Sequence, residues 1–300
     1  MQPIDAFIVG VPKAGTTWLA NTLSQHPDIQ LSNPKEPNIV SSHKGTFDRI
    51  TKEPDWSDYD NCFTRPGLRI DASVHTFACP LSPERIFRKI PNIKFILCLR
   101  EPVSRTISHW NMVKDTQSDA DNNVDWTDFS VAWSDARLKD DTMYGKSMTR
   151  WLEYFSIDNF LIIDSQQMKD NPNKILSQID SFLKLKPNDY TINLSKHTNS
   201  ATNRRPLTHF GKICRFIFAN IPNLIKKPIV IILQSRDINV YSIPIISKKP
   251  ILEKTNNNHY PTCSDIIISD LKIFEKITGF STAHWVKEIN HHCLNINEIS

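Results

Sequence analysis

Apolar residues in the first two-thirds of the chain form short runs, many of them β-branched, that alternate with stretches of helical spacing. The runs typical of buried strands cover residues 7–9, 29–31, 68–72, 93–99 and 159–164. Helical spacing covers residues 17–26, 126–138, 143–155 and 172–183, and a further helix is predicted to begin near Pro102. Strands that alternate with helices favour a parallel sheet with helices on both faces and ligands at the carboxyl ends of the strands. The pattern therefore predicts an α/β fold of three layers.

The remaining segments lack this alternation. Residues 40–67 and 115–123 are polar and predict irregular segments, whereas residues 265–279 have helical spacing that Gly279 should end. We therefore expect a single domain over residues 1–300. It is divided into a core of about 1–190, a variable region at 191–260, and a C-terminal helical segment at 261–300 that docks on the core.

Composition narrows the possible functions. The 300 residues carry a formal net charge of +4, and 39% are hydrophobic, which supports a real core and argues against disorder. The modest, dispersed positive charge favours a local site for an anion over a nucleic-acid-binding surface. The six cysteines include no C-x-x-C pair, which gives zinc and redox motifs little support. No apolar stretch suits a signal peptide or a membrane span, so we expect a cytoplasmic protein with at most peripheral membrane contact.

A candidate anion site follows the first predicted strand. The run at 7–9 leads into a turn with Gly10 and Gly15 and then into a helix. A glycine-containing loop at a helix start gathers backbone N–H groups and the positive end of the helix dipole, which bind phosphate-like anions. The spacing is close to the nucleotide P-loop, but Thr16 stands at the Walker lysine position and Lys13 lies upstream. A P-loop-like fold is predicted, although a plain strand–turn–helix with a solvated lysine has the same pattern.

A second block with anion chemistry follows the run at 93–99. Arg100 stands at the predicted C-terminal tip of this strand, and Ser104 and Ser108 share one face of the following helix. An arginine and a hydroxyl together can hold a phosphate through several charge-assisted hydrogen bonds. Arg105 turns away from Arg100 on the helix, so we expect it to form a salt bridge. The alternative is an amphipathic helix with solvated arginines.

The two blocks together indicate two phosphate sites at neighbouring strand ends. A nucleotide that carries both a 5′- and a 3′-phosphate needs such a pair. A kinase would instead need a Walker lysine and acidic metal ligands, and neither stands in the expected place. Two alternatives remain: a P-loop-type nucleotide kinase with a relocated lysine, and a catalytically inactive adenine-nucleotide-binding module.

The motifs P-K-x-G-T-T-W at 12–18 and L-R-x-P-x-x-R-x-x-S at 99–108 resemble those of sulfotransferases that use 3′-phosphoadenosine-5′-phosphosulfate (PAPS). The resemblance is nearest to the bacterial and polysaccharide-type branches. It implies that Lys13 stabilises the leaving phosphate and that Arg100 and Ser108 hold the 3′-phosphate. The other nucleotide contacts would come from Ala14, Gly15, Thr16, Thr17 and Trp18, with Trp18 stacked on adenine.

Two residues are candidates for the base under this resemblance. In the polysaccharide-type and bacterial branches, the glutamate of K-E-P after the second strand deprotonates the acceptor, a role that would fall to Glu36. In the small-molecule branch the base is a histidine that follows a strand and precedes the 3′-phosphate arginine, as His75 precedes Arg100. A free imidazole can act as a base near neutral pH. Plain surface turns also explain both residues, and we rank Glu36 first and His75 second.

The resemblance also implies a reaction and an acceptor. A sulfuryl group would pass from PAPS to a hydroxyl or an amine, and K-E-P favours a carbohydrate or glycolipid over small phenols. No metal is required, because basic side chains and backbone N–H groups meet the charge of the nucleotide. Tyr144 and Lys146 would line the acceptor groove, and Arg204 or Arg205 would supply a basic loop over the nucleotide.

Overall fold

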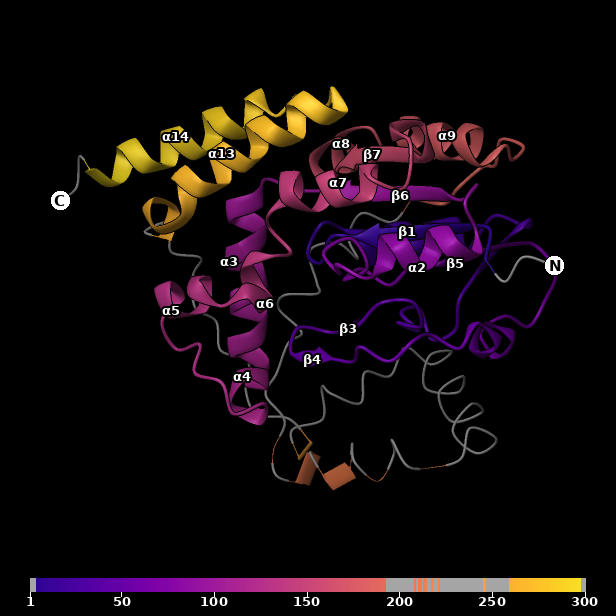
Figure 1. Cartoon of the computed structure of the whole chain (residues 1–300), viewed down its shortest axis with the longest axis horizontal. Coiled ribbons are helices and arrows are strands. Elements are labelled where there is room, and N and C mark those ends of the chain that lie inside the picture. Colours follow the sequence, from indigo (N-terminus) through magenta and orange to yellow (C-terminus); the bar gives the residue numbers. More distant parts are fainter. Residues whose placement is uncertain are drawn as a thin grey trace.

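The computed structural model describes residues 4–192 and 259–297, together with a few single positions between 208 and 246. The expected variable region at 191–260, including Arg204 and Arg205, therefore lies almost entirely outside the described residues. Within the described ranges, strands and helices alternate along the chain (Figure 1).

A five-stranded parallel sheet forms the centre of the fold. Its strands are β1 (Ala6–Gly10), β2 (Ile29–Leu31), β5 (Leu68–Asp71), β6 (Lys94–Leu99) and β7 (Phe160–Asp164), in the order β2-β5-β1-β6-β7. From β1 the chain builds toward β5 and β2 on one side and then toward β6 and β7 on the other. Such a reversal is a topological switch point, where α/β folds bind ligands beyond the carboxyl ends of the strands. The five strands predicted from the sequence are confirmed.

Helices flank the sheet (Figure 1). They are α1 (Thr16–Leu23), α2 (Ser82–Lys89), α3 (Pro102–Thr116), α4 (Ser118–Asp121), α5 (Phe129–Ser134), α6 (Ala136–Lys139), α7 (Tyr144–Leu152), α8 (Ser165–Asp170), α9 (Pro172–Leu183), α13 (Tyr260–Thr278) and α14 (Ala283–Asn297). The hairpin β3 (His43–Lys44) and β4 (Asp48–Arg49) and the short 3-10 helices η1 (Trp56–Asn61) and η2 (Ile157–Asn159) lie in connecting segments. In Figure 1, α13 and α14 lie together at the top and the hairpin lies below the sheet. No helix of the described ranges has the length and apolar character needed to cross a bilayer.

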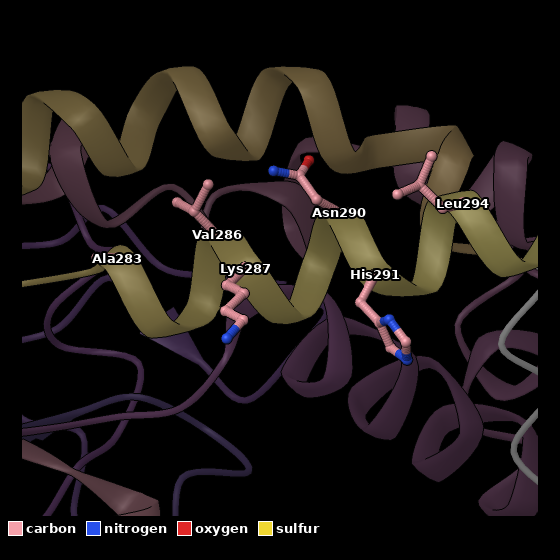
Figure 2. A pocket seen from close by; sticks show the side chains of 6 residues that line it. All are labelled: Ala283, Val286, Lys287, Asn290, His291 and Leu294. Atoms are coloured by element: carbon pink, nitrogen blue, oxygen red, sulfur yellow. The ribbon is translucent and has the colours of Figure 1, made fainter.

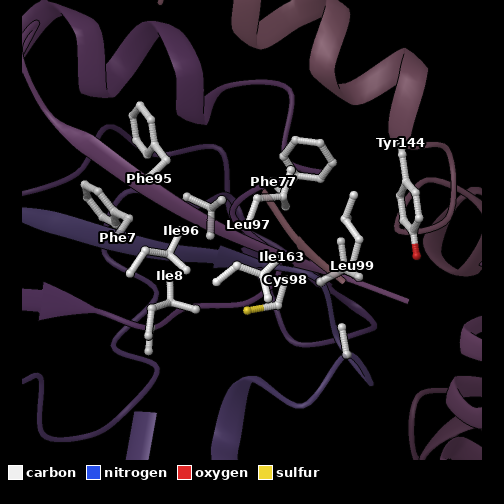
Figure 3. Packing of buried hydrophobic residues seen from close by; sticks show 14 of the residues in the cluster. Phe7, Ile8, Phe77, Phe95, Ile96, Leu97, Cys98, Leu99, Tyr144 and Ile163 are labelled. Atoms are coloured by element: carbon white, nitrogen blue, oxygen red, sulfur yellow. The ribbon is translucent and has the colours of Figure 1, made fainter. Parts of the chain in front are cut away.

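β-Branched and aromatic residues form the central strands because both faces of the sheet are covered. All five residues of β1 are buried. The ring of Phe95 in β6 stacks with Phe7 at 6.1 Å and with Phe160 at 4.8 Å between centroids (Figure 3 shows Phe7 and Phe95). Trp151 of α7 meets Phe95 edge-on at 4.8 Å. These ring contacts connect the neighbouring strands β1, β6 and β7 to the helix α7. The residues that follow β1 and β6 therefore extend from a well-packed sheet.

The connecting segments differ from the sequence expectations in three places. Residues 115–123 are largely helical, because α3 extends to Thr116 and α4 follows. The single helix expected over 126–138 is two short helices, since Asp135 is extended and its carboxylate accepts the N–H of Arg137 to begin α6. The hydrogen bond from the Asp135 side chain to the backbone thus interrupts the continuous helix that was expected. The segment 40–67, expected to be irregular, contains the β3–β4 hairpin and η1.

The C-terminal helix α13 packs directly on α7. The carboxylate of Asp270 accepts hydrogen bonds from the backbone N–H groups of Gly145 (2.7 Å) and Lys146 (2.8 Å), and so caps the first turn of α7. The two helices are so close that a Cβ atom on Gly145 would lie 2.3 Å from the carbonyl oxygen of Asp270. α13 ends at Thr278, and Gly279 follows with a φ of 71°, as the sequence predicted.

Candidate functional site

The loop between β1 and α1 is held on two sides at the carboxyl edge of the sheet. The N–H of Val11 donates to the carbonyl oxygen of Cys98 in β6 at 2.7 Å. On the other side, a Cβ atom on Gly10 would lie 2.7 Å from the carbonyl oxygen of Val74, so only glycine permits this approach. Lys13 has a φ of 73°, which is uncommon for a residue with a side chain. The loop is therefore a tightly fixed bend that contains Lys13.

The start of α1 can receive an anion, whereas the start of α3 cannot. Gly15 precedes α1 with a φ of 83°, and no described side chain caps the first turn of α1, which has no acidic residue. The Glu101 carboxylate, in contrast, binds the first amides of α3, with the N–H of Val103 at 2.7 Å and that of Ser104 at 2.6 Å. A helix start with available N–H groups and an uncompensated dipole attracts a phosphate. In the same loop Thr17 is exposed, Lys13 and Gly15 are half-buried, and Ala14 and Thr16 are buried.

Lys13 reaches from this loop toward α3. Its side chain is half-buried, and its Nζ lies 3.8 Å from Met112 Sδ. The pKa of His109 lies far below its ordinary value. Burial is the largest cause and Arg105 the next, and His75 and Lys13 lower the pKa to a smaller extent. His109 and Met112 stand about one turn apart on α3. Both observations therefore place the Lys13 ammonium beside the middle of α3.

Arg100 and Ser108 border the same region from β6 and α3. Arg100 directly follows β6, is half-buried, and its carbonyl oxygen accepts a hydrogen bond from the Tyr144 hydroxyl at 2.9 Å. Its guanidinium has no hydrogen-bond or ion-pair partner in the part of the chain that the structure describes. Ser108 is also half-buried. Ser104 is engaged by α13, because its Oγ lies 2.9 Å from the hydroxyl oxygen of Tyr260.

Glu36 lies on the loop after β2 and forms an ion pair with its neighbour Lys35. The distance from Lys35 Nζ to Glu36 Oε1 is 2.7 Å, and the two side chains are 25% and 35% exposed. Two contacts tie this loop to the residues after β5. Lys35 Nζ lies 3.5 Å from the carbonyl oxygen of Ala72, and the N–H of Asn38 donates to Ser73 Oγ at 3.0 Å. The edge of the sheet that carries the loop between β1 and α1 therefore also carries Glu36.

His75 is not the free imidazole that the sequence suggested. It is 6% exposed, and its Nδ1 lies 3.1 Å from Asp141 Oδ2 and 3.3 Å from Asp141 Oδ1. Asp141 is itself buried between α6 and α7, and His109 Nδ1 lies 3.7 Å from its Oδ2. Burial acts to raise the pKa of Asp141, but His75, His109 and Arg105 lower it below its usual range. Asp141 is therefore an ionised carboxylate within a buried cluster of histidines.

The neighbours of the His75–Asp141 pair include neutral histidines and a buried arginine. Burial and then the charge of Arg49 lower the pKa of His43 to about 4, so this imidazole is neutral at pH 7, as is His109. Arg105, for which we expected a salt bridge, is fully buried and donates to Thr142 Oγ1 at 2.6 Å. The cluster thus holds one ionised carboxylate and one guanidinium among histidines.

Three residues assigned from the resemblance lie elsewhere than expected. Trp18 is 7% exposed and packs in the hydrophobic core, so most of its indole ring is covered by the protein itself. Tyr144 is fully buried and binds the Arg100 carbonyl oxygen instead of lining a groove. Lys146 is exposed, and its Nζ pairs with Asp140 Oδ1 at 2.8 Å. Helix periodicity turns Trp18 and Tyr144 inward and Lys146 outward.

The sequence did not reveal Asp141 or His109 as members of the site. Asp141 is 66 positions from His75, and nothing in the local pattern separates it from Asp140, which pairs with an exposed lysine instead. His109 stands next to Ser108 in the second motif. Helical spacing alone places His109 on the buried face of α3 with Arg105, and this signal could have identified it.

A separate hollow lies along α14 (Figure 2). Its lining consists of Ala283, Val286, Lys287, Asn290, His291 and Leu294, all from one helix. None of these residues belongs to the predicted site, and the hollow lacks the convergent groups from several elements that define a substrate site. Within the described ranges, no cluster of histidine, cysteine and acidic side chains is arranged to hold a metal ion.

Comparison with protein families matches the "Sulfotransferase domain" model over residues 3–211. Among solved structures, the chain is similar to a sulfotransferase from Alicyclobacillus acidocaldarius, with a TM-score of 0.61 and 17% identity. That similarity covers 94% of this chain and 98% of the other chain. At this level of identity the likeness concerns the fold, which is the P-loop-like α/β fold that the sequence predicted.

Two curated relatives align with part of the chain. Heparan sulfate glucosamine 3-O-sulfotransferase 5 of Mus musculus is 27% identical over 199 residues, which cover 63% of this chain and 56% of the relative. Bifunctional heparan sulfate N-deacetylase/N-sulfotransferase 1 of Caenorhabditis elegans is 25% identical over 190 residues, which cover 60% of this chain and 22% of the relative. The chain thus spans about half the length of the first relative and less than a quarter of the second.

Proposed function

Because the chain belongs to the sulfotransferase domain family, we propose that it transfers a sulfuryl group from PAPS to a hydroxyl or an amine of an acceptor. In this reaction the acceptor atom attacks sulfur, and the bond from sulfur to the bridging oxygen breaks. The leaving group is 3′-phosphoadenosine-5′-phosphate (PAP), and a base takes the acceptor proton. Positioning and charge stabilisation supply most of the rate enhancement, as in phosphoryl transfer.

The observation that carries this proposal is the contrast between the two helix starts at the sheet edge. The uncapped start of α1, next to Lys13, suits the 5′-phosphate and the charge that develops on the leaving oxygen. The start of α3 is closed by Glu101, so the second phosphate would be held by side chains. Arg100 has an available guanidinium for this purpose, and Ser108 adds a hydroxyl.

Two groups near this edge can take the acceptor proton. Glu36 lies on the loop after β2, and His75 lies on the turn after β5. The hydrogen bond from Asn38 to Ser73 joins the two segments. Either group is therefore close to an acceptor that approaches the carboxyl edge of β2 and β5.

We propose a carbohydrate or a glycolipid as the acceptor. Two features support this class. The K-E-P motif at 35–37 resembles that of polysaccharide-type enzymes. The relatives in mouse and C. elegans are both named for heparan sulfate, a carbohydrate polymer.

Transfer of labelled sulfate from PAPS tests the proposed function. A screen of glycans, glycolipids and phenols should give incorporation into a glycan or a glycolipid. The variant Lys13→Ala should reduce kcat by about 100-fold or more, because it removes a charge that stabilises the leaving group. The variant Arg88→Ala, which changes an exposed residue of α2, serves as the control and should transfer sulfate at the wild-type rate.

Two other outcomes would replace this proposal. Turnover of ATP that depends on Mg²⁺ and does not respond to PAPS would identify a nucleotide kinase. Tight binding of PAP without transfer to any acceptor would identify an inactive nucleotide-binding module.

A further inference from the structure

We propose that Asp141 is a positioning residue that holds His75 as the proton acceptor of the transfer reaction, an inference that rests on the proposed function. The proposal assigns a role to a buried pair in which His75 Nδ1 lies 3.1 Å from the carboxylate of Asp141. Nucleophile activation in enzymes commonly uses a histidine that a carboxylate orients through its second ring nitrogen.

The donors and acceptors around the pair fix the tautomer of His75. An ionised carboxylate only accepts hydrogen bonds, so Asp141 requires the proton of neutral His75 to be on Nδ1. His75 Nε2 then carries the lone pair. This nitrogen has no hydrogen bond within the described ranges, and the side chain of His75 is 8% exposed. The lone pair on Nε2 therefore allows His75 to accept the proton of the acceptor.

His109 has the opposite tautomer for a similar reason. Arg105 only donates, and its Nη1 lies 3.2 Å from His109 Nδ1, so this nitrogen must be the acceptor. The proton on His109 Nε2 can then be donated to Thr46 Oγ1 at 2.8 Å. Both nitrogens of His109 are therefore engaged internally. The two histidines lie with ring centroids 6.0 Å apart, yet only His75 keeps an available nitrogen.

The turn that carries His75 contacts the end of β1 and the loop that follows it. The carbonyl of Val74 is so close to Gly10 that a Cβ atom there would lie 2.7 Å from its oxygen, and the N–H of Phe77 donates to the Val9 carbonyl at 2.9 Å. On its other side, His75 faces His109, whose pKa also responds to the charge of Lys13. His75 therefore lies between the loop that would bind the 5′-phosphate and the helix that carries Ser108.

Titratable and charged groups of several elements surround the His75–Asp141 pair. The groups that face the pair are His109 and Arg105 of α3, His43 and Arg49 of the β3–β4 hairpin, and Asp140 next in sequence. His43 and His109 are neutral at pH 7 and add no repulsion. The nearest full charge is the carboxylate of Asp141, which stabilises an imidazolium as it forms. The guanidinium of Arg105 opposes this effect from further away.

Glu36 has a different setting at the same edge. Its carboxylate is paired with the ammonium of Lys35 at 2.7 Å, whereas His75 Nε2 has no hydrogen bond within the described ranges. In the proposed step, the acceptor O–H or N–H transfers its proton to His75 Nε2 while its heavy atom bonds to sulfur. The electron pair of the breaking sulfur–oxygen bond goes to the leaving phosphate of PAP. Charge and atoms therefore balance without a metal or an external reactant.

The first test measures which ring nitrogen of His75 carries the proton in the wild-type protein. In the 300-residue protein labelled with ¹⁵N-histidine, two-bond correlation spectra should show His75 protonated on Nδ1 and without a proton on Nε2, with and without PAP. A proton on Nε2 would overturn the proposal, because Nε2 could not then take the proton of the acceptor. This measurement needs no variant and no acceptor, so it holds even if a substitution in the cluster prevents folding.

Two isosteric variants provide the second test. His75→Asn keeps an N–H group that can donate to Asp141 but has no lone pair at the Nε2 position, and Asp141→Asn keeps size and removes the charge. Each should lower kcat by about 100-fold or more, with unchanged affinity for PAP. Asp141→Asn should also move the proton of His75 toward Nε2. The matched control is His284→Asn, which alters a different His–Asp pair, between α14 and β7, and should keep the wild-type kcat.

The outcomes separate this inference from the proposed function. Wild-type kcat in His75→Asn, together with a large loss in Glu36→Ala, would assign the proton to Glu36 and overturn the inference alone. Failure of the wild-type protein to bind PAP would contradict the proposed function, whereas the ¹⁵N spectra would still decide whether Asp141 sets the tautomer of His75.

Discussion

Arg100 belongs to the core of the fold through its backbone and to the proposed nucleotide site through its side chain. Its carbonyl oxygen is bonded to the buried hydroxyl of Tyr144, while its guanidinium has no partner among the described residues. The backbone position is thus fixed from inside, and the side chain remains available. An arginine in this state binds a phosphate without first giving up an internal ion pair.

Arg100→Ala should therefore weaken binding of PAP and spare binding of AMP, which lacks the 3′-phosphate. Hydrogen bonds to charged groups contribute about 1.5–3 kcal/mol, so the loss for PAP should be about 10- to 100-fold. Calorimetry with both nucleotides measures this difference, and Arg88→Ala is again the control. Equal losses for PAP and AMP would show that Arg100 does not contact the 3′-phosphate.

At the same scale, His43 should make the free energy of unfolding fall as the pH falls. Its pKa is about 4 when folded, below the unfolded value of about 6.5, so the unfolded chain takes up the proton first. The stability contribution is complete above pH 6.5 and is lost as the pH falls through 4. Between pH 7.5 and pH 5 this amounts to about 2 kcal/mol.

Urea denaturation at pH 7.5 and pH 5 measures the effect of His43. The variant His43→Gln has no imidazole to protonate, so its stability should change less between the two pH values than that of the wild type. The same pH dependence in both proteins would mean that His43 does not stay neutral in the fold.

Among the elements, α13 and α7 approach each other closely at Gly145. Asp270 supplies the cap that α7 lacks from its own residues, and Gly145 provides the space. Because Tyr144 begins α7 and binds the Arg100 carbonyl, this joint also supports the tip of β6. A helix distant in the sequence thus takes part in holding a proposed ligand residue.

Substitutions at this joint should destabilise the protein. Asp270→Asn weakens a charged cap and should cost about 1 kcal/mol, and Gly145→Ala introduces a clash at 2.3 Å and should cost about 1–3 kcal/mol. Thermal unfolding measures both changes. Lys272→Ala, on the exposed face of α13, should leave the melting temperature unchanged. A stable Gly145→Ala protein would imply that the two helices can separate without cost.

Elements were predictable from the sequence where apolar spacing was strong and local. The runs that became β6 and β7 are continuous apolar stretches, and α3 and α9 begin at the prolines that marked them. Asp135 shows why short helices were not predictable. Its carboxylate caps α6 and ends α5, an effect that depends on one side-chain conformation and leaves the apolar spacing unchanged.

For the whole molecule, the C-terminal helices supply a share of the core that the first 190 residues cannot replace. Their buried side chains are Tyr260, Cys263, Ile267, Leu271 and Phe274 of α13 and Trp285 and Ile289 of α14. Burial of these groups contributes on the order of 10 kcal/mol, which is similar to the whole stability of a typical domain.

A chain that ends at residue 258 should therefore fail to fold cooperatively. The expected signs are loss of the near-ultraviolet circular dichroism of the aromatic core and a broad urea transition. The matched control is a chain that ends at residue 297, which retains α13 and α14. A cooperative transition in the shorter chain would show that the sheet and its first helices are stable alone.

The candidate site was predictable to the extent that its residues lie in continuous motifs. Lys13, Arg100 and Ser108 come from two such motifs, and the structure brings these to one sheet edge. Asp141 could not be found in this way, because its partner His75 lies on another element and only folding joins them. Trp18 and Tyr144 are buried, and the burial of a side chain likewise depends on the assembled fold. The cytoplasmic location stays a prediction.

The contact between Gly10 and Val74 has a consequence for engineering this protein. The turn with His75 and the loop with Lys13 meet there without room for a single methyl group, so neither can be reshaped independently. Substitutions on the two sides should show strong epistasis. A library that alters residues 74–77 to accept new acceptors will therefore also change donor affinity, and it should be selected for both properties together.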